Sequence, residues 1–207
     1  MGEPYASFWR EYRVTILATL ALAAVSVAGL YVRGRGADLA LFRTVNAGLA
    51  GPAARALAVA GYVVGATWFS LLLFVGLFLL GWRRLGVSAV AATAALTLGV
   101  LILKLLTDQP RPWQQIPGVR VVGASDYGQG YPSGHAAQAF LSAFLLVHYP
   151  PPRWYFAAGL YGLAGLVAFS RVSAGQHLPA DVIAGSLIGL LGGLLWTRSR
   201  LWPARGS

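Results

Sequence analysis

The stretch SRVSAGQHLPAD, residues 170–181, places Arg171, His177 and Asp181 within twelve residues, between two long apolar runs. A carboxylate beside a histidine fixes the tautomer of the imidazole and leaves the other ring nitrogen free to act. His177 and Asp181, four residues apart, therefore form a candidate nucleophile or acid–base pair. A purely structural His–Asp pair at the membrane surface is an equally good interpretation of this stretch taken alone.

A second polar block, YPSGH at residues 131–135, precedes another apolar run. Ser133 is suited to cap a helix there, with Gly134 and His135 in its first turn. The free backbone N–H groups of a helix N-terminus bind anions. The block predicts an anion site with a histidine beside it, although an ordinary capped helix would have the same sequence.

The third block, KLLTDQPRP at residues 104–112, holds two cations. Lys104 is predicted to lie in the last turn of a helix that Pro110 and Pro112 bring to an end, so that Arg111 reaches back from a loop. Alone, this block is compatible with a snorkelling lysine and an interfacial arginine.

The rest of the sequence consists mainly of apolar runs long enough to cross a bilayer. Hydrophobic residues make up 57% of the chain and charged residues 11%, which is typical of a membrane protein with several spans. We predict an all-α bundle of six transmembrane helices, forming a single domain over residues 1–207. The expected spans are 14–32, 65–82, 87–106, 133–149, 155–169 and 179–196. The first run could instead be a cleaved signal peptide, but five further runs favour an anchor.

An amphipathic segment follows the first predicted span, at residues 37–63. Its apolar residues recur at helical spacing: Leu41, Phe42, Val45 and Leu49. We expect a helix that lies in the membrane interface and is broken near Gly51 and Pro52.

The charge distribution bears on orientation and on partners. The net charge is +10, but the basic residues are scattered at the ends of apolar runs, which argues against nucleic-acid binding. Six spans place both termini on one side, with the basic residues Arg10, Arg13, Arg83, Arg84, Arg153, Arg198, Arg200 and Arg205. The opposite side carries as many basic residues, so the raw count does not decide. Lys104, Arg111 and Arg171 belong to the polar blocks, however, and with these set aside the positive-inside rule favours the cytoplasm for the termini and the outer face for the polar blocks. The absence of cysteine excludes disulfides, thiolate metal sites and a cysteine nucleophile.

This topology brings the three polar blocks to one membrane surface. The segment between His135 and Ser170 is long enough for two spans and a turn, and the span ending at Lys104 starts from the opposite side. Three cations, two histidines and one carboxylate would then surround one pocket. Arginine, lysine and helix-terminal amides suit phosphate oxygens, at about 1.5–3 kcal/mol for each charge-assisted bond. Two histidines can divide the roles of nucleophile and acid in phosphoryl transfer.

Together the blocks resemble the type 2 phosphatidic acid phosphatase superfamily of lipid phosphatases, whose pattern is K-x6-RP, then PSGH, then SR-x5-H-x3-D. The matching residues are Lys104, Arg111 and Pro112; Pro132, Ser133, Gly134 and His135; and Ser170, Arg171, His177 and Asp181. The resemblance implies that His177 attacks phosphorus, that Asp181 orients it, and that His135 protonates the leaving oxygen and later activates water. The residues implied to hold the phosphoryl oxygens are Lys104, Arg111, Ser133, Gly134 and Arg171.

The expected function is that of an integral-membrane phosphatase with no metal or other cofactor. The leading substrate is a polyprenyl pyrophosphate such as undecaprenyl pyrophosphate, followed by phosphatidylglycerol phosphate and phosphatidate, met at the outer face of a bacterial cytoplasmic membrane. Tyr131 and the interfacial helix are expected along the path of the lipid. The alternative is a lipid-phosphate binding or transport protein that keeps the phosphate site without turnover.

Overall fold

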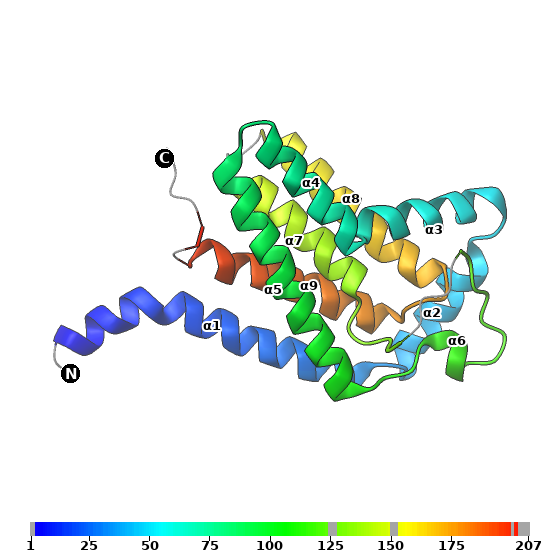
Figure 1. Cartoon of the computed structure of the whole chain (residues 1–207). Coiled ribbons are helices and arrows are strands. Elements are labelled where there is room, and N and C mark those ends of the chain that lie inside the picture. Colours follow the sequence, from blue (N-terminus) through cyan, green and yellow to red (C-terminus); the bar gives the residue numbers. More distant parts are fainter. Residues whose placement is uncertain (1–2, 124–127, 150–152, 200, 203–207) are drawn as a thin grey trace.

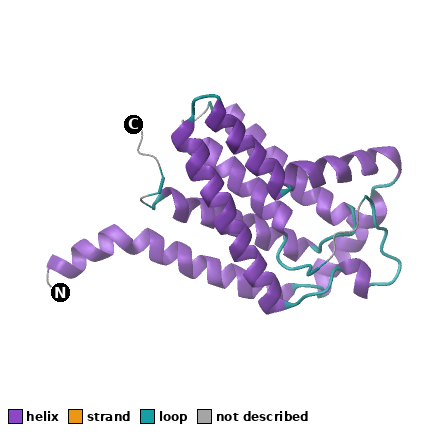
Figure 2. Cartoon of the chain, in the orientation of Figure 1, coloured by secondary structure: helices purple, strands orange, loops and turns teal. Residues whose placement is uncertain are grey.

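The computed structural model of the chain describes residues 3–123, 128–149, 153–199 and 201–202, with side chains from Tyr12 onward. Throughout these ranges the regular structure is helical (Figures 1 and 2). In chain order the helices are α1 (Glu3–Val32), α2 (Gly36–Gly48), α3 (Gly51–Gly65), α4 (Thr67–Leu79), α5 (Arg83–Thr107), α6 (Pro112–Gln115), α7 (Gly134–His148), α8 (Trp154–Ser173) and α9 (Pro179–Thr197). The prediction of an all-α fold is confirmed.

The number of spans differs from the prediction of six. Four segments are helical, long and apolar enough to cross a membrane: Tyr12–Val32, Arg83–Gln115, Trp154–Ser173 and Pro179–Thr197. Helices occur at the other two predicted positions, but α4 has 13 residues and α7 has 15, whereas a span needs about 20. Over the residues that the structure describes, the chain is thus an all-α membrane protein with four candidate spans, or five if α2 and α3 together form one.

The predicted break near Gly51 and Pro52 is confirmed. Helices α2 and α3 meet there at an angle of 119°. Gly51 has a φ of +81°, a backbone conformation that residues with a Cβ rarely adopt. Pro52 then stands in the first turn of α3, where its missing N–H costs no hydrogen bond.

Helix α7 lies inside the bundle and contacts α3, α4, α5, α8 and α9. Its closest neighbour is α9, because two glycines of α9 face the α7 backbone. A Cβ at Gly185 would collide with the carbonyl oxygen of Ser133, and one at Gly189 with that of Ala137. Small residues at such positions let helix backbones approach closely in a membrane. Consequently the N-termini of α7 and α9, which carry two of the polar blocks, lie side by side.

The first and last helices begin and end at one end of the bundle, and the polar blocks lie at the other end. The start of α1 and the end of α9 lie at one end, at the left of Figure 1, and α6 and the connection from α8 to α9 lie at the other. The three polar blocks therefore meet at the end opposite the first and last helical turns. Of the arginines used to orient the chain, the side chains of Arg10, Arg200 and Arg205 lie outside the described residues.

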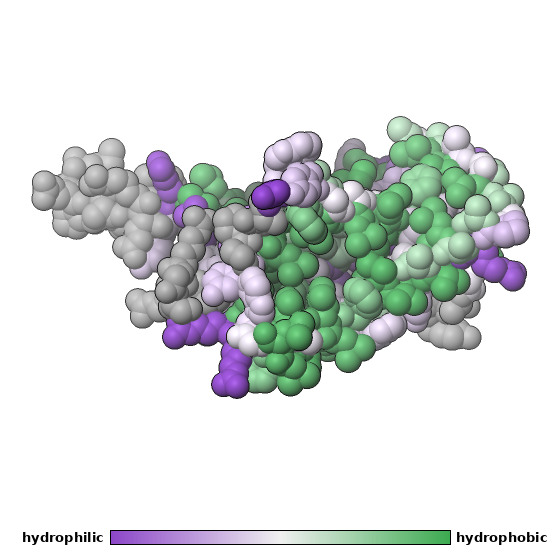
Figure 3. Space-filling view, turned by 90° about the horizontal axis from the view of Figure 1, so that it is seen from above, coloured by the Kyte–Doolittle hydropathy of each residue, from purple (hydrophilic) through white to green (hydrophobic). Residues whose placement is uncertain are grey.

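The surface of the bundle is suited to lipid. Hydrophobic residues cover most of the face shown in Figure 3, and hydrophilic residues lie toward its margins. Large apolar side chains are exposed on several helices, among them Leu72, Leu98, Leu101, Leu105, Phe156 and Ile183. Exposed apolar surface of this extent marks contact with a membrane.

Candidate active site

A cavity of about 350 Å³ lies where the three polar blocks meet. It is lined by Gly65, Thr67, Thr97, Val100, Leu101, Lys104, Arg111, Gly134, His135, Gln138 and His177. Five of the eight predicted site residues are in this lining. The other three, Ser133, Arg171 and Asp181, are buried and are not part of the described lining. The predicted convergence of the blocks on one pocket agrees with this geometry.

His177 is held through its Nδ1 atom, mainly by a backbone group. Nδ1 lies 2.7 Å from the carbonyl oxygen of Gly130 and 3.5 Å from Oδ2 of Asp181. A carbonyl oxygen can only accept, so Nδ1 carries the proton and the lone pair of the neutral ring is on Nε2. Nε2 lies 3.3 Å from Nη1 of Arg111. The orienting contact that the sequence assigned to Asp181 is therefore the longer of two.

The surroundings of His177 keep its ring neutral. Burial lowers the pKa of His177 well below its usual value, and the positive charges of Arg111, Lys104 and Arg171 and the neighbouring His135 act in the same direction. A buried imidazole among cations binds a proton poorly. These surroundings favour the neutral form of the ring.

The connection before α7 holds three site side chains with consecutive carbonyl groups. The carbonyls of residues 128, 129 and 130 accept hydrogen bonds from Arg111 Nε, Lys104 Nζ and His177 Nδ1, respectively. Arg111 Nη1 also donates to the carbonyl of Gln176, at 3.2 Å. Backbone groups thus orient the two cations and His177, and such contacts have no sequence signature.

His135 opens α7 beside the predicted cap. The hydroxyl of Ser133 accepts a hydrogen bond from the N–H of Ala136 at 3.4 Å, which confirms Ser133 as the N-cap. Ser133 itself is fully buried, and its hydroxyl is used within the helix terminus. The N–H groups of the first turn, at Gly134 and His135, border the cavity, where a helix N-terminus favours an anion.

Helix α3, which includes part of the segment expected to lie in the interface, forms a wall of the site. The rings of Tyr62 and His135 lie 5.1 Å apart between centroids, and Arg171 lies over the ring of Tyr62, with Cζ 5.5 Å from the ring centroid. At Gly65, a Cβ would come within 2.9 Å of the Cβ of His135. One tyrosine and one glycine in an apolar helix carry no spacing that would indicate this role.

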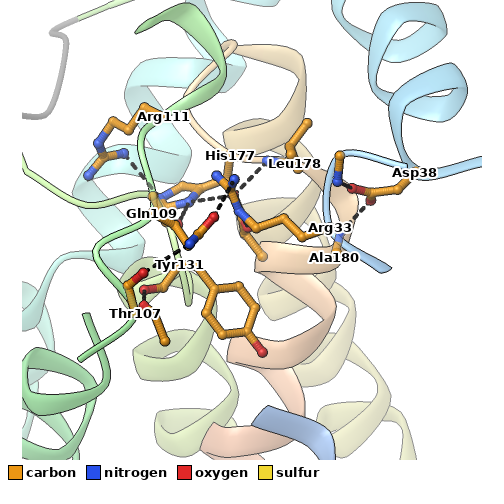
Figure 4. A network of polar contacts seen from close by, with 12 residues as sticks. Arg33, Asp38, Thr107, Gln109, Arg111, Tyr131, His177, Leu178 and Ala180 are labelled. Carbon is orange, nitrogen blue, oxygen red and sulfur yellow. Dashed lines mark hydrogen bonds and ion pairs between the residues drawn. The ribbon is translucent and has the colours of Figure 1, made fainter. Parts of the chain in front are cut away.

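Asp181 is fully buried and is engaged by two groups besides His177. Oδ1 lies 2.6 Å from Nε of Arg33, and Oδ2 accepts a hydrogen bond from the N–H of Leu178 at 2.9 Å. Figure 4 shows Arg33 reaching from the end of α1 toward the loop of His177. The sequence did not indicate Arg33, because a single arginine after an apolar run is also what an anchored span shows.

The expectation that Tyr131 lines the path of the lipid is wrong. Tyr131 is fully buried, and its hydroxyl donates to the carbonyl of Ser26 in α1, at 2.6 Å. Burial and the charge of Asp181 raise the pKa of Tyr131 to about 12. The residue therefore ties the YPSGH block to α1 and is not among the described residues that line the cavity.

The profile of the PAP2 superfamily matches residues 85–204, more than half of the chain. The chain belongs to the PAP2 superfamily. This PAP2 protein is 34% identical over 108 residues to an undecaprenyl-diphosphatase from Sulfolobus acidocaldarius, over 52% of this chain and 51% of the relative. It is 29% identical over 122 residues to the bacitracin transport permease protein BcrC from Bacillus licheniformis, over 58% of each. The chain thus spans little more than half the length of these curated relatives.

The PAP2 fold is also found among solved structures. The crystal structure of Aquifex aeolicus LpxE has a TM-score of 0.73 and 27% sequence identity with this chain, over 81% of this chain and 99% of LpxE. The likeness therefore extends beyond the matched residues 85–204 into the N-terminal helices. The chain therefore has the fold of a PAP2 superfamily membrane protein.

Proposed function

We propose that this protein hydrolyses a phosphomonoester or pyrophosphate of a membrane lipid through a phosphohistidine formed on His177. The observation that carries the proposal is the geometry around His177: its Nδ1 faces the Gly130 carbonyl, which leaves the lone pair on Nε2, and His177 lines one cavity together with Lys104 and Arg111. An anion drawn into such a cavity meets a nucleophile that is already deprotonated.

The first step forms a bond between Nε2 and phosphorus and breaks the bond from phosphorus to the lipid oxygen. His135, protonated, gives its proton to that leaving oxygen. In the second step the now neutral His135 takes a proton from water, whose oxygen bonds to phosphorus as the N–P bond breaks. Lys104, Arg111, Arg171 and the N–H groups at Gly134 stabilise the charge that builds up on the phosphoryl oxygens.

The proposed substrate is a polyprenyl pyrophosphate, with phosphatidylglycerol phosphate and phosphatidate as the next candidates. The relative from Sulfolobus acidocaldarius named undecaprenyl-diphosphatase supports this order. Leu101, which borders the cavity, has 48% of its surface exposed on the apolar side of the bundle. A lipid headgroup could therefore reach the cavity from the bilayer.

We further propose the topology in which α4 and α7 also cross the membrane, giving six spans. The termini would then be cytoplasmic and the cavity would lie at the outer face of a bacterial cytoplasmic membrane. Helices of 13 and 15 residues can fulfil this role where the bilayer thins locally or flanking residues snorkel.

The direct test is phosphate release by the purified protein in detergent, using the three candidate lipids with and without a chelator. We expect release that resists the chelator, is blocked by vanadate and is lost in His177→Ala. His148→Ala is the matched control, because His148 bonds within α7 to the carbonyl of Phe144. Full activity of His177→Ala would overturn the mechanism. Binding of the lipid without release of phosphate would instead indicate a binding or transport protein.

A further inference from the structure

Arg33 stands at the end of α1, outside the residues that the PAP2 profile matches. Its side chain is only 4% exposed and forms an ion pair with Asp181, with Nε 2.6 Å from Oδ1. A second nitrogen, Nη2, lies 3.5 Å from Oδ2. The guanidinium therefore faces both oxygens of a carboxylate whose own side chain is fully buried.

The same guanidinium also binds the segment that precedes Arg111. Nη2 donates to the carbonyl of Pro110 at 2.6 Å, and Nη1 lies 3.5 Å from Oε1 of Gln109. Figure 4 shows Arg33 and Gln109 close to His177. One side chain thus links α1 to two of the polar blocks.

Arg33 also packs against the residue whose carbonyl holds His177. A Cβ added at Gly130 would lie 2.8 Å from Nη2 of Arg33 and 2.9 Å from the carbonyl oxygen of Pro110. The N–H of Gly130 donates to the carbonyl of Gln109 at 2.6 Å. Arg33 therefore pairs with the Asp181 carboxylate and lies beside Gly130, and that carboxylate and the Gly130 carbonyl both face Nδ1 of His177.

The turn that carries Arg33 is itself fixed to the start of α9. Asp38 accepts a hydrogen bond from the N–H of Gly34 through Oδ2 and one from the N–H of Ala180 through Oδ1, each at 2.7 Å. This bridge sets the position of the α1–α2 turn relative to Asp181. The position of Arg33 relative to Asp181 is therefore fixed by this bridge.

The ion pair between Arg33 and Asp181 is buried, so the loss of either charge has a large effect on the other. A buried carboxylate that loses its counter-charge is strongly destabilised, and it responds by taking up a proton or by admitting water. Either response would change the field at Nδ1 of His177 and release the Gly130 segment. We propose that Arg33 is a positioning residue for the nucleophile, acting through Asp181 and Gly130; this inference rests on the proposed role of His177.

The experiment compares Arg33→Gln and Arg33→Lys with the matched control Arg35→Gln. Arg35 lies in the same turn, is exposed and stacks over the ring of Tyr31, so its loss removes the same charge without touching the site. We expect Arg33→Gln to lower kcat at least tenfold with KM within about twofold of the parent. Arg33→Lys should recover part of kcat, since an ammonium keeps the charge but lacks the second donor face. Arg35→Gln should keep the parental values.

A double variant tests whether Arg33 acts through Asp181. If it does, Arg33→Gln combined with Asp181→Asn should be no slower than the slower single variant, because the two changes break one interaction. Multiplicative losses would overturn the proposed route. So would parental kcat in both Arg33 variants, or a loss confined to KM.

The test separates this inference from the proposed function and from a merely structural role. If His177→Ala keeps full activity, the proposed function fails whatever Arg33 does. If His177→Ala is inactive but both Arg33 variants turn over like the parent, only the present inference fails. Should Arg33→Gln not fold, Arg33→Lys decides: a thermal midpoint near that of the parent with a lowered kcat supports positioning, and an unchanged kcat overturns it.

Discussion

Nδ1 of His177 lies 2.7 Å from the carbonyl oxygen of Gly130, closer than the 3.5 Å that separates it from Oδ2 of Asp181. The main chain therefore sets the tautomer of the proposed nucleophile, and the carboxylate adds negative charge from a greater distance. Substitution of Asp181 removes the carboxylate, whereas no substitution removes the Gly130 carbonyl. The two contacts with His177 can therefore be tested separately.

This division predicts that Asp181→Asn retains measurable phosphatase activity. Asparagine keeps an oxygen near Nδ1 and the Gly130 contact persists, so we expect kcat to fall about ten- to a hundredfold, which corresponds to about 1.4–2.7 kcal/mol in the barrier. His177→Ala, measured in parallel, should show no release above background. Equal loss in the two variants would show that Asp181 is as indispensable as the nucleophile.

Gly130→Ala tests the backbone contact. The added methyl group would crowd Arg33 and the Pro110 carbonyl, at 2.8 and 2.9 Å, and so push the Gly130 carbonyl away from His177. We expect a lower kcat with bound lipid retained. Gly159→Ala is the control, because a Cβ there meets nothing within 4 Å. Parental turnover in Gly130→Ala would mean that the contact does not limit catalysis.

The pH dependence of kcat/KM follows from the lowered pKa of His177. The attacking ring must be neutral, and a group with a lowered pKa stays neutral as the pH falls through the ordinary histidine value of about 6.5. The acid limb of the profile should therefore lie below that value. Because the profile also needs a protonated His135, it should be bell-shaped. An acid limb at or above about 6.5 would contradict the assignment of His177.

The lowered pKa of His177 also makes the free energy of unfolding depend on pH. In the unfolded chain the imidazole takes up a proton below about pH 6.5, whereas in the folded protein it resists protonation. The unfolded state then binds more protons, so the folded state should lose stability as the pH falls below that value. Thermal midpoints in detergent at a series of pH values measure this loss, and His177→Gln should reduce it.

The close approach of α7 and α9 predicts a packing effect. Gly189→Val would force a side chain against the α7 backbone at Ala137, and overpacking of this kind costs about 1–3 kcal/mol or more. We expect a lower thermal midpoint and lower activity. Gly162→Val, at a position where a Cβ meets nothing within 4 Å, should behave like the parent. Similar midpoints for the two variants would show that α7 and α9 can separate without cost.

Much of the site could be predicted from the sequence, because its chemistry is local. The cap at Ser133, the proline at the start of α9 and the prolines after α5 all follow from short-range backbone rules. The alternation of helices along the chain then predicts that Lys104, His135 and His177 lie at one end of the bundle. All three line the cavity. Run length in the sequence exceeds helix length wherever a turn is itself apolar, as at residues 80–82, which is why helix α4 is shorter than the predicted span.

What only the tertiary structure decided is which groups hold these residues in place. Arg33 and Asp181 are 148 positions apart, and the Gly130 carbonyl that binds His177 belongs to a chemical group present in every residue. Sequence patterns determine residue types and local periodicity, so they determined the helices and the reactive side chains. Ion pairs between distant segments, and hydrogen bonds to backbone carbonyls, depend on how the helices pack, and packing is settled only when the whole chain folds.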